Sequence, residues 1–285
     1  MGASPNVCLK LSNRAENVLL VRETLIGVAE ALAIDDSDLN DIKTAVTEAC
    51  NNVVMHAYAG KEGPLELELY VGSGSSDSGS IEVVVRDRGA GIQPRIPRLR
   101  ETPAGIGIPV MQALARRVEF SSTEDQGTEV RMEFATPGSQ ALKPLPEEGV
   151  ELPAVAQAEE LAGAMGIAIA PTHLARAVLP RLLCVLAARA HFSTDRISDT
   201  QLVADALVAQ MPDSIGESHL GIGVSVEPRT LELHVGPLRR DRAKWRIVGS
   251  GIAGLSPVVE KLTNQHGVVA VGSSEALALR LNDQR

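Results

Sequence analysis

Two spacings of apolar residues occur along the first half of the chain, and each predicts a different kind of element. Residues 16–33 repeat apolar positions three and four apart, and residues 35–59 do so again after an Asp/Ser cluster typical of a helix start. A further helical pattern, PVMQALARRV, follows a glycine-rich stretch. Four segments instead alternate apolar and polar positions, as half-buried strands do: 64–71, 80–87, 118–123 and 128–134. This order predicts an α+β fold, a two-layer sandwich of helices and sheet.

A polar stripe runs beside the apolar face of the second helical segment. In EACNNVVMHAYAG (48–60), Glu48, Asn52 and His56 stand four residues apart, so they share one side of a helix. On a helical wheel they flank the apolar face instead of opposing it; that face consists of Ile42, Ala45, Val46, Ala49 and Val53. A solvated helix edge has the same spacing, but a stripe beside a core-packed face predicts the rim of a cleft.

Three glycine motifs follow the stripe, and each alone has an ordinary explanation as a turn or a helix start. The sequence Asp87-Arg88-Gly89-Ala90-Gly91 ends a predicted strand. Its glycines would let the backbone approach a flat ring, and its Asp would accept a hydrogen bond from that ring. The sequence Gly105-Ile106-Gly107 precedes a helix with Pro109 in its first turn, which exposes backbone N–H groups to phosphate. The pair Gly127-Thr128 opens the last predicted strand.

In this order and spacing, the stripe and the three motifs resemble the N, G1, G2 and G3 boxes of the Bergerat-fold ATPases, the superfamily of gyrase, Hsp90, histidine kinases and MutL. Within that superfamily, EACNNVVMHAY followed by the glycine boxes is most similar to the anti-sigma-factor serine kinases of the RsbW and sporulation type. The resemblance covers residues 8–136 and implies the Bergerat ATPase fold with bound ATP and Mg²⁺.

The resemblance also implies a role for each matching residue. Asn52 would ligate the Mg²⁺ that bridges the phosphates, and Glu48 would be the general base that takes a proton from the attacking hydroxyl. Asp87 would hold the adenine amino group. The other nucleotide contacts follow by position: Gly89 and Gly91 beside the ring, Gly105, Ile106 and Gly107 over the phosphates, and Thr128 completing the adenine pocket. For His56 a structural role is favoured over a catalytic one.

Two departures from the family pattern put catalytic turnover in question more than ATP binding. The lid between Gly91 and Gly105 is short and carries three arginines, which either touch phosphate or form a solvated charge run: Arg95, Arg98 and Arg100. The sequence AGIGI also lacks the extra glycine often seen at the second phosphate box.

The second half of the chain has the same order of predicted elements as the first. RISDTQLVADALVAQ aligns with DLNDIKTAVTEACNN, and RTLELHVGPLRR aligns with GSIEVVVRDRGA. In this alignment the site residues are replaced: Glu48 by Ala206, Asn52 by Gln210, Asp87 by Pro237, Gly105 by Ala253 and Gly107 by Leu255. The second half is therefore either a degenerate copy kept for packing or partner binding, or an unrelated domain with similar patterns.

These patterns predict three parts of the chain. Residues 1–137 are the ATP-binding kinase or anti-sigma domain, and the Pro/Gly-rich residues 138–153 are a linker. Residues 154–285 are a degenerate ATPase-like domain without nucleotide motifs.

Composition limits the partners and the compartment. A formal charge of −9 with 2% aromatic residues argues against direct contact with nucleic acid, which favours basic patches and stacking rings. No apolar stretch approaches the roughly 18–20 residues that span a bilayer, so no membrane association is expected. Three widely separated cysteines fit a reducing cytoplasm: Cys8, Cys50 and Cys184.

Two classes of function remain. In the first, the protein is a serine/threonine kinase and anti-sigma switch in transcription regulation. It phosphorylates an anti-anti-sigma (STAS-type) partner and sequesters a sigma factor in the alternative state. In the second, it is a nucleotide-gated binding module, with the second half acting as a pseudo-dimer partner in place of a homodimer. Glu48 favours the first class, whereas the atypical phosphate loop and the altered second half favour the other. A metabolic enzyme that uses another nucleotide has no supporting feature.

Overall fold

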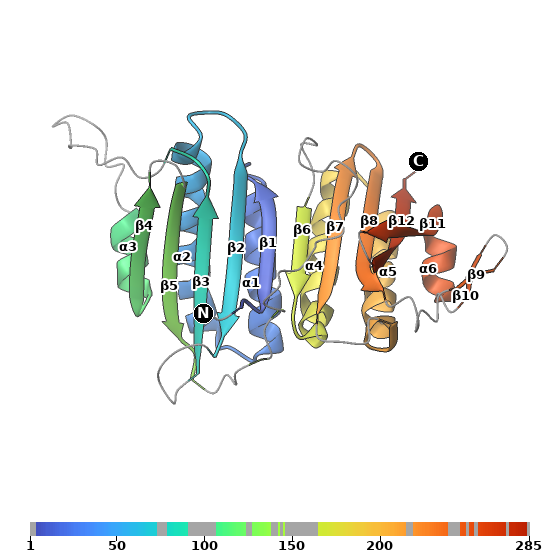
Figure 1. Cartoon of the computed structure of the whole chain (residues 1–285), viewed down its shortest axis with the longest axis horizontal. Coiled ribbons are helices and arrows are strands. Elements are labelled where there is room, and N and C mark those ends of the chain that lie inside the picture. Colours follow the sequence, from blue (N-terminus) through green and yellow to red (C-terminus); the bar gives the residue numbers. More distant parts are fainter. Residues whose placement is uncertain are drawn as a thin grey trace. The chain divides into compact units, whose positions relative to one another are not determined.

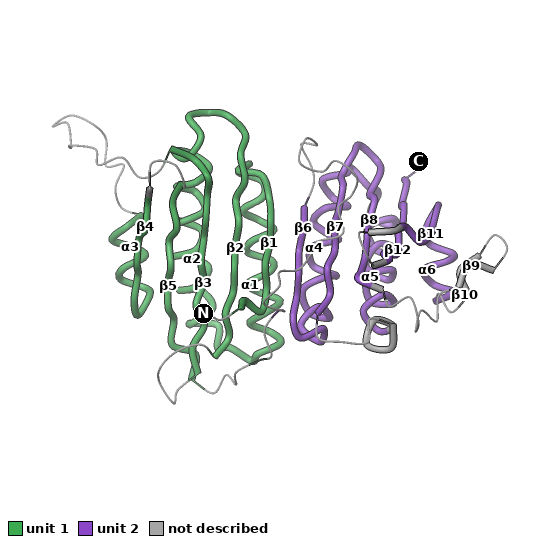
Figure 2. The backbone as a smooth tube through the Cα atoms, in the orientation of Figure 1, with its two compact units in different colours: residues 1–142 green, residues 143–285 purple. Residues whose placement is uncertain are grey.

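The computed structural model divides into two compact units, residues 1–142 and 143–285 (Figure 2). The structure describes residues 4–72, 79–90, 107–123, 127–137, 142, 145, 165–214, 219–238, 246–248, 251–253, 256–271 and 274–283. The division falls inside the predicted linker, residues 138–153, of which only residues 142 and 145 are described. None of the described helices is long and apolar enough to cross a membrane.

Unit 1 is an antiparallel sheet with helices packed on one face (Figure 1). Its described elements are β1 (Val7–Ser12), α1 (Asn17–Ala31), α2 (Asp36–Asn52), a π-helical turn η1 (Val53–Ala57), β2 (Pro64–Val71), β3 (Ser80–Asp87), α3 (Gly107–Leu114), β4 (Arg117–Thr123) and β5 (Gly127–Ala135). Neighbouring strands pair in the order β1-β2-β3-β5-β4. The predicted α+β sandwich is confirmed for this unit.

The apolar faces that periodicity predicts form the core of unit 1. The predicted apolar face of the second helical segment, which runs from α2 into η1, is at most 5% exposed at each position: Ile42, Ala45, Val46, Ala49 and Val53. In β2, three fully buried leucines alternate with glutamates that lie on the other face of the sheet. On that face Arg86 of β3 forms ion pairs with Glu68 (2.5 Å) and Glu129 (2.6 Å). Opposite charges on neighbouring strands therefore stabilise the face of the sheet opposite the described helices.

Unit 2 also consists of strands and helices (Figure 1). Its described elements are β6 (Met165–Ile169), a 3₁₀ turn η2 (Thr172–Leu174), α4 (Ala175–Arg189), α5 (Thr194–Ser214), β7 (Leu220–Glu227), β8 (Thr230–Leu238), β9 (Arg246–Val248), β10 (Gly251–Ala253), α6 (Pro257–Leu262), β11 (Gln265–Val271) and β12 (Ser274–Asn282). Five strands pair in the order β6-β7-β8-β12-β11, and β9 pairs with β10 as a separate hairpin.

The first two helices of unit 2 repeat those of unit 1 without an insertion or deletion. Helices α1 and α4 each contain 15 residues, and Ala175 opens α4 158 positions after Asn17 opens α1. Both are followed by one residue of positive φ at the same offset, Ala33 (52°) and His191 (58°). The buried positions of α2 and α5 also coincide at this offset: Ile42, Ala45, Val46, Ala49 and Cys50 against Thr200, Val203, Ala204, Leu207 and Val208.

The strand ladders of the two units have the same register. One row across the sheet of unit 1 consists of Val7, Leu69, Val83, Met132 and Val118. The equivalent row of unit 2, built from the same sequence of pairings, consists of Met165, Val224, Leu233, Leu279 and His266. Counterparts lie 158 residues apart in β1 and β6 but 148 apart in β4 and β11. The two units therefore differ in length in the connections that follow the second helix.

Two features of unit 1 differ from the sequence prediction. Strand β1 is missing from the predicted order, although its buried residues Val7, Leu9 and Leu11 alternate with polar ones. The helix predicted over 109–118 was too long: α3 ends at Leu114 and β4 begins at Arg117. Pairing of β4 with β5 decides this boundary, because the ladder satisfies backbone groups that a longer helix would withdraw.

Candidate functional site

The end of α2 and the start of α3 bring three of the predicted residues together. Glu48 and Asn52 lie one turn apart on α2 and are half-buried. A Cβ atom placed on Gly107 would lie 3.1 Å from Oε2 of Glu48, and 3.7 and 3.8 Å from Nδ2 and Oδ1 of Asn52. The absence of a side chain at Gly107 thus leaves a small space lined by a carboxylate and a carboxamide. Oxygen atoms of these two groups are suitable ligands for Mg²⁺, so the residues present fit the implied metal.

The helix changes its winding immediately after Asn52. Residues Val53–Ala57 form the π-helical turn η1, a rare conformation that is frequent at functional sites. Because a π-helical turn contains more residues than an α-helical one, a spacing of four no longer keeps His56 in line with Asn52. The side chain of His56 is exposed. The winding therefore interrupts the predicted three-residue stripe after its second member.

Asp87, at the end of β3, is oriented by two backbone N–H groups. The residue is 5% exposed, and its Oδ1 accepts hydrogen bonds from the N–H of Gly89 (2.8 Å) and the N–H of Thr128 (3.3 Å). No described residue donates a hydrogen bond to Oδ2. Two donors to one oxygen fix the rotation of the carboxylate. The second oxygen is thereby set in a defined direction as an acceptor.

Two glycines allow close backbone contacts around Asp87. A Cβ on Gly89 would lie 2.1 Å from the carbonyl oxygen of Ala57, and one on Gly127 would lie 2.1 Å from that of Asp87. Gly127 also has a φ of 78°, which favours glycine. The N–H of Ala90 donates to the carbonyl oxygen of Ala57 at 3.0 Å. The turn after β3 therefore rests on the end of η1, which connects the Asp87 region to the helix of Asn52.

Part of the predicted site lies outside the described residues: Gly91, Gly105 and Ile106, together with the lid arginines Arg95, Arg98 and Arg100. Sequence reasoning also missed a residue, Tyr58, whose hydroxyl contacts the turn after β3. The available signal was its position two residues after His56, at the end of the same helical segment.

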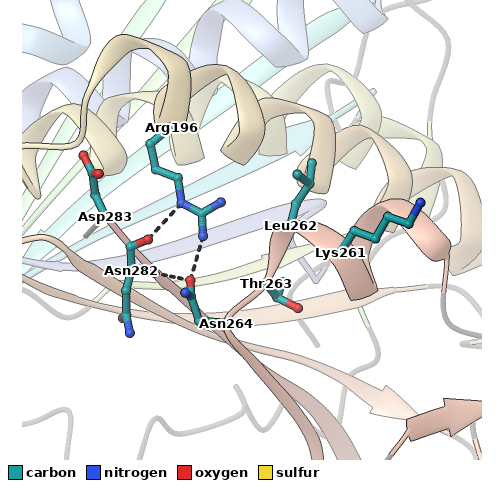
Figure 3. A pocket seen from close by; sticks show the side chains of 7 residues that line it. All are labelled: Arg196, Lys261, Leu262, Thr263, Asn264, Asn282 and Asp283. Carbon is teal, nitrogen blue, oxygen red and sulfur yellow. Dashed lines mark hydrogen bonds between the residues drawn. The ribbon is translucent and has the colours of Figure 1, made fainter. Parts of the chain in front are cut away.

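A hollow of about 240 Å³ lies in unit 2, beside the start of α5 (Figure 3). Its lining residues are Arg196, Lys261, Leu262, Thr263, Asn264, Asn282 and Asp283. The guanidinium of Arg196 donates to the carbonyl oxygen of Asn282 (3.0 Å) and to Oδ1 of Asn264 (2.7 Å), so it ties α5 to the last strand. The positions aligned with the predicted nucleotide site lie further along α5, around Ala206, so this hollow is not their counterpart.

Comparison with known proteins places unit 1 in a family. The model of the family described as "Histidine kinase-like ATPase domain" matches residues 11–134, within unit 1. An anti-sigma F factor of Caldanaerobacter subterraneus subsp. tengcongensis is 35% identical over 132 residues, which make up 44% of this chain and 89% of that protein. This chain belongs to the histidine kinase-like ATPase family. The resemblance predicted from the four boxes is confirmed.

Of two further relatives of this histidine kinase-like ATPase, one is named an anti-sigma factor and the other a protein kinase. An anti-sigma F factor of Heyndrickxia coagulans is 30% identical, over 44% of this chain and 88% of that protein. The serine-protein kinase RsbW of Bacillus cereus is 33% identical over 102 residues, which make up 36% of this chain and 61% of that kinase.

Both predicted carboxylates of the unit 1 site are replaced at the aligned positions of unit 2, whereas the carboxamide is kept in type. On α5, Ala206 occupies the position of Glu48 at the common offset of 158, and Gln210 occupies that of Asn52. On β8, the shared register places Pro237 at the position of Asp87. Neither a carboxylate base nor an adenine acceptor remains at these described positions, although the buried framework around them is kept.

Proposed function

We propose that unit 1 binds Mg·ATP and transfers the γ-phosphoryl group to a serine or threonine hydroxyl of a partner protein. The observation that carries this proposal is the convergence of Glu48 and Asn52 on Gly107 at the N-terminus of α3. Helix N-termini favour phosphate because their N–H groups are free to donate. A module that only binds nucleotide has no need of a carboxylate one turn from the metal ligand, so Glu48 supports a kinase.

Asn52 supplies an amide oxygen to Mg²⁺, a hard cation that prefers oxygen ligands. When bound, Mg·ATP supplies the phosphoryl group and the metal charge that neutralises its oxygens. The Glu48 carboxylate accepts the proton of the attacking hydroxyl while that oxygen bonds to phosphorus and the bond to the ADP oxygen breaks. Gly107 leaves the room that these groups share.

The adenine ring is held at the other end of the site. Oδ2 of Asp87 accepts a hydrogen bond from the adenine amino group, because Oδ1 is already engaged by the N–H groups of Gly89 and Thr128. Gly91, Gly105 and Ile106 lie outside the described residues; for them the resemblance implies contacts with the ring (Gly91) and with the phosphates (Gly105 and Ile106). A purine with an amino group at this position is the expected ligand.

The partner of this kinase is proposed from the names of its relatives, an anti-sigma F factor and a serine-protein kinase. The phosphorylated protein is an anti-anti-sigma (STAS-type) protein, and a sigma factor is bound in the alternative state. The setting of such a partner switch is the cytoplasm. One measurement tests the activity: transfer from γ-labelled ATP to an anti-anti-sigma protein of the same genome.

A second candidate function is a nucleotide-gated binding module without turnover, in which unit 2 serves as the pseudo-dimer partner. The altered positions on α5 and β8 favour it, since they fit a domain that binds proteins but no nucleotide. Glu48→Gln separates the two candidates. A kinase keeps its calorimetric Mg·ATP affinity and transfers phosphate about 10²–10⁴-fold more slowly, whereas a binding module shows no transfer before or after the change.

We further propose that unit 2 is a degenerate copy of unit 1 that has lost the nucleotide site. The common strand order, the shared ladder register and the offset of 158 residues through two helices support a duplication. Calorimetry on the full chain is expected to give one Mg·ATP per chain. Asn52→Ala abolishes that binding, and Gln210→Ala, the matched change in unit 2, leaves it unchanged. A stoichiometry of two would contradict this proposal while leaving the kinase proposal intact.

A further inference from the structure

Tyr58 joins three segments around the turn that follows β3. It is the first residue after η1, and its hydroxyl accepts a hydrogen bond from the N–H of Arg88 (2.7 Å). The same hydroxyl donates to the carbonyl oxygen of Pro64 (2.5 Å), at the start of β2. The phenol of Tyr58 therefore links the end of the α2–η1 helix to the start of β2 and to Arg88, the residue after β3.

The surroundings of Tyr58 are shaped to receive its ring. A Cβ on Gly63 would lie 2.2 Å from the ring, so a side chain at this position would collide with it. Gly63 is itself held in place, because its N–H donates to Oδ1 of Asn13 (2.9 Å) and its carbonyl oxygen accepts from the N–H of Asn13 (2.9 Å). The ring thus packs against a fixed piece of backbone, and the position of its hydroxyl is determined.

The turn that Tyr58 contacts is the one that orients Asp87. Arg88, whose N–H binds the phenol, lies between Asp87 and Gly89, and the N–H of Gly89 holds Oδ1 of Asp87. On the other side, Tyr58 continues the helical segment that carries Asn52. The contact therefore links the turn that follows the proposed adenine acceptor to the helical segment that carries the proposed metal ligand.

We propose that Tyr58 is a positioning residue for adenine recognition, whose hydroxyl sets the turn of Asp87 at the correct place relative to Asn52. This proposal rests on the proposed binding of Mg·ATP by unit 1. The role belongs to the hydroxyl and not to the ring, because the ring alone makes neither hydrogen bond. A phenylalanine at this position would fill the same space and leave the N–H of Arg88 without its acceptor.

The chain offers a matched control for this test, since it contains only two tyrosines. Tyr70 also uses its hydroxyl, which donates to Oε2 of Glu68 (2.6 Å), on the face of the sheet opposite the described helices. Tyr58→Phe and Tyr70→Phe therefore each remove one hydroxyl from unit 1. Only the first is expected to disturb the turn of Asp87.

The experiment measures the affinities of the full chain and both variants for Mg·ATP and Mg·ITP by calorimetry. ITP has a carbonyl oxygen where adenine has its amino group, so it cannot donate to Asp87. Tyr58→Phe is expected to lower ATP affinity about tenfold, the effect of losing roughly one well-placed hydrogen bond. The affinity of Tyr58→Phe for ITP should change little, and Tyr70→Phe should bind both nucleotides as the wild type does. The preference for ATP over ITP therefore falls only in Tyr58→Phe.

The outcomes separate this proposal from the proposed function. A wild-type chain that binds no Mg·ATP would overturn both. Wild-type binding with an unchanged ATP preference in Tyr58→Phe would overturn the role of Tyr58 alone. Equal losses of ATP and ITP affinity with a lower melting temperature would show a merely structural role, which also overturns it.

A second measurement uses Tyr70→Phe, in which Tyr58 is the remaining tyrosine, and so does not require Tyr58→Phe to fold. Ionisation of Tyr58 removes the proton that its hydroxyl donates to the carbonyl oxygen of Pro64. The oxygen still accepts from the N–H of Arg88, but it loses its anchor on β2 and no longer holds the turn of Asp87 in a fixed place. By linkage, saturating Mg·ATP must then move the phenolate absorbance transition to higher pH. A transition at the same pH with and without nucleotide would contradict the proposal.

Discussion

Gly107 lies against Glu48 so closely that a Cβ on the glycine would stand 3.1 Å from the carboxylate oxygen Oε2. Such a contact is tolerated only if the side chain of Glu48 moves by a few tenths of an ångström. The fold is little affected by that movement, because the end of a half-buried side chain can yield. The space beside Asn52, however, is reduced by a methyl group.

We therefore expect Gly107→Ala to weaken Mg·ATP binding about tenfold, or about 1.4 kcal/mol, while the melting temperature changes by less than about 4 °C. Calorimetry and thermal unfolding measure the two effects. Gly267→Ala on β11 is the control, since a Cβ there meets nothing within 4 Å. Undiminished ATP binding by Gly107→Ala would show that nucleotide does not use this space.

Gly127→Ala should destabilise unit 1 strongly, because the new Cβ would lie 2.1 Å from the carbonyl oxygen of Asp87 and φ is 78°. Gly60→Ala isolates the backbone strain, since Gly60 has a φ of 84° with nothing within 4 Å of its Cβ. We expect a loss of about 1–2 kcal/mol in unfolding free energy for Gly60→Ala and at least about 3 kcal/mol for Gly127→Ala. Similar losses in both variants would mean that the start of β5 shifts easily.

Cys50 lies on α2 between Glu48 and Asn52 and is fully buried, and burial raises the pKa of its thiol to about 12. Reaction with a thiol reagent therefore requires opening of unit 1. ATP at 100 times its Kd should slow this labelling about 100-fold, provided that reclosing outpaces the reaction. Cys184 of unit 2 provides the internal comparison in a mass-spectrometric assay. Equal slowing of both cysteines would contradict nucleotide binding to unit 1 alone.

The stability of unit 1 should depend on Tyr70 at high pH. Burial and the hydrogen bond to Glu68 raise the pKa of Tyr70 to about 12, from an ordinary value of 10.0. A raised pKa favours the neutral phenol in the folded state. Its contribution is therefore fully present below pH 10 and is lost as the pH rises toward 12. Denaturant titrations should show a less steep fall in unfolding free energy over this window for Tyr70→Phe than for the wild type.

Helical periodicity and strand alternation were sufficient to predict most of unit 1. The apolar face of α2 is buried as predicted, and the alternating segments beginning at Pro64 and Ser80 match β2 and β3 residue for residue. These signals work because each element buries one face against one core. Strand β1 was overlooked although its three core residues alternate, and the end of α3 was misplaced because strand pairing, a long-range interaction, decides where it stops.

The predicted site was placed less completely than the fold. Its residue types and spacing pointed to Glu48, Asn52 and Asp87, and the structure brings Gly107 to the first two and Thr128 to the third. The orientation of Asp87 depends on backbone N–H groups, and the residue types in the sequence do not reveal where those groups point. The π-helical winding of η1 and the hydrogen bonds of Tyr58 are likewise invisible to a periodicity of 3.6.

The wide turn η1 also sets the angle about the helix axis between Asn52, the proposed metal ligand at the end of α2, and the phenol of Tyr58 that follows it. Removal of one residue from Val53–Ala57 would rotate Tyr58 about the helix axis relative to Asn52, because each residue of the turn adds a fixed rotation. Its hydroxyl would then point away from Arg88, although every side chain of the site would still be present. Between Asn52 and Tyr58 the chain should therefore accept substitutions more readily than any change in length.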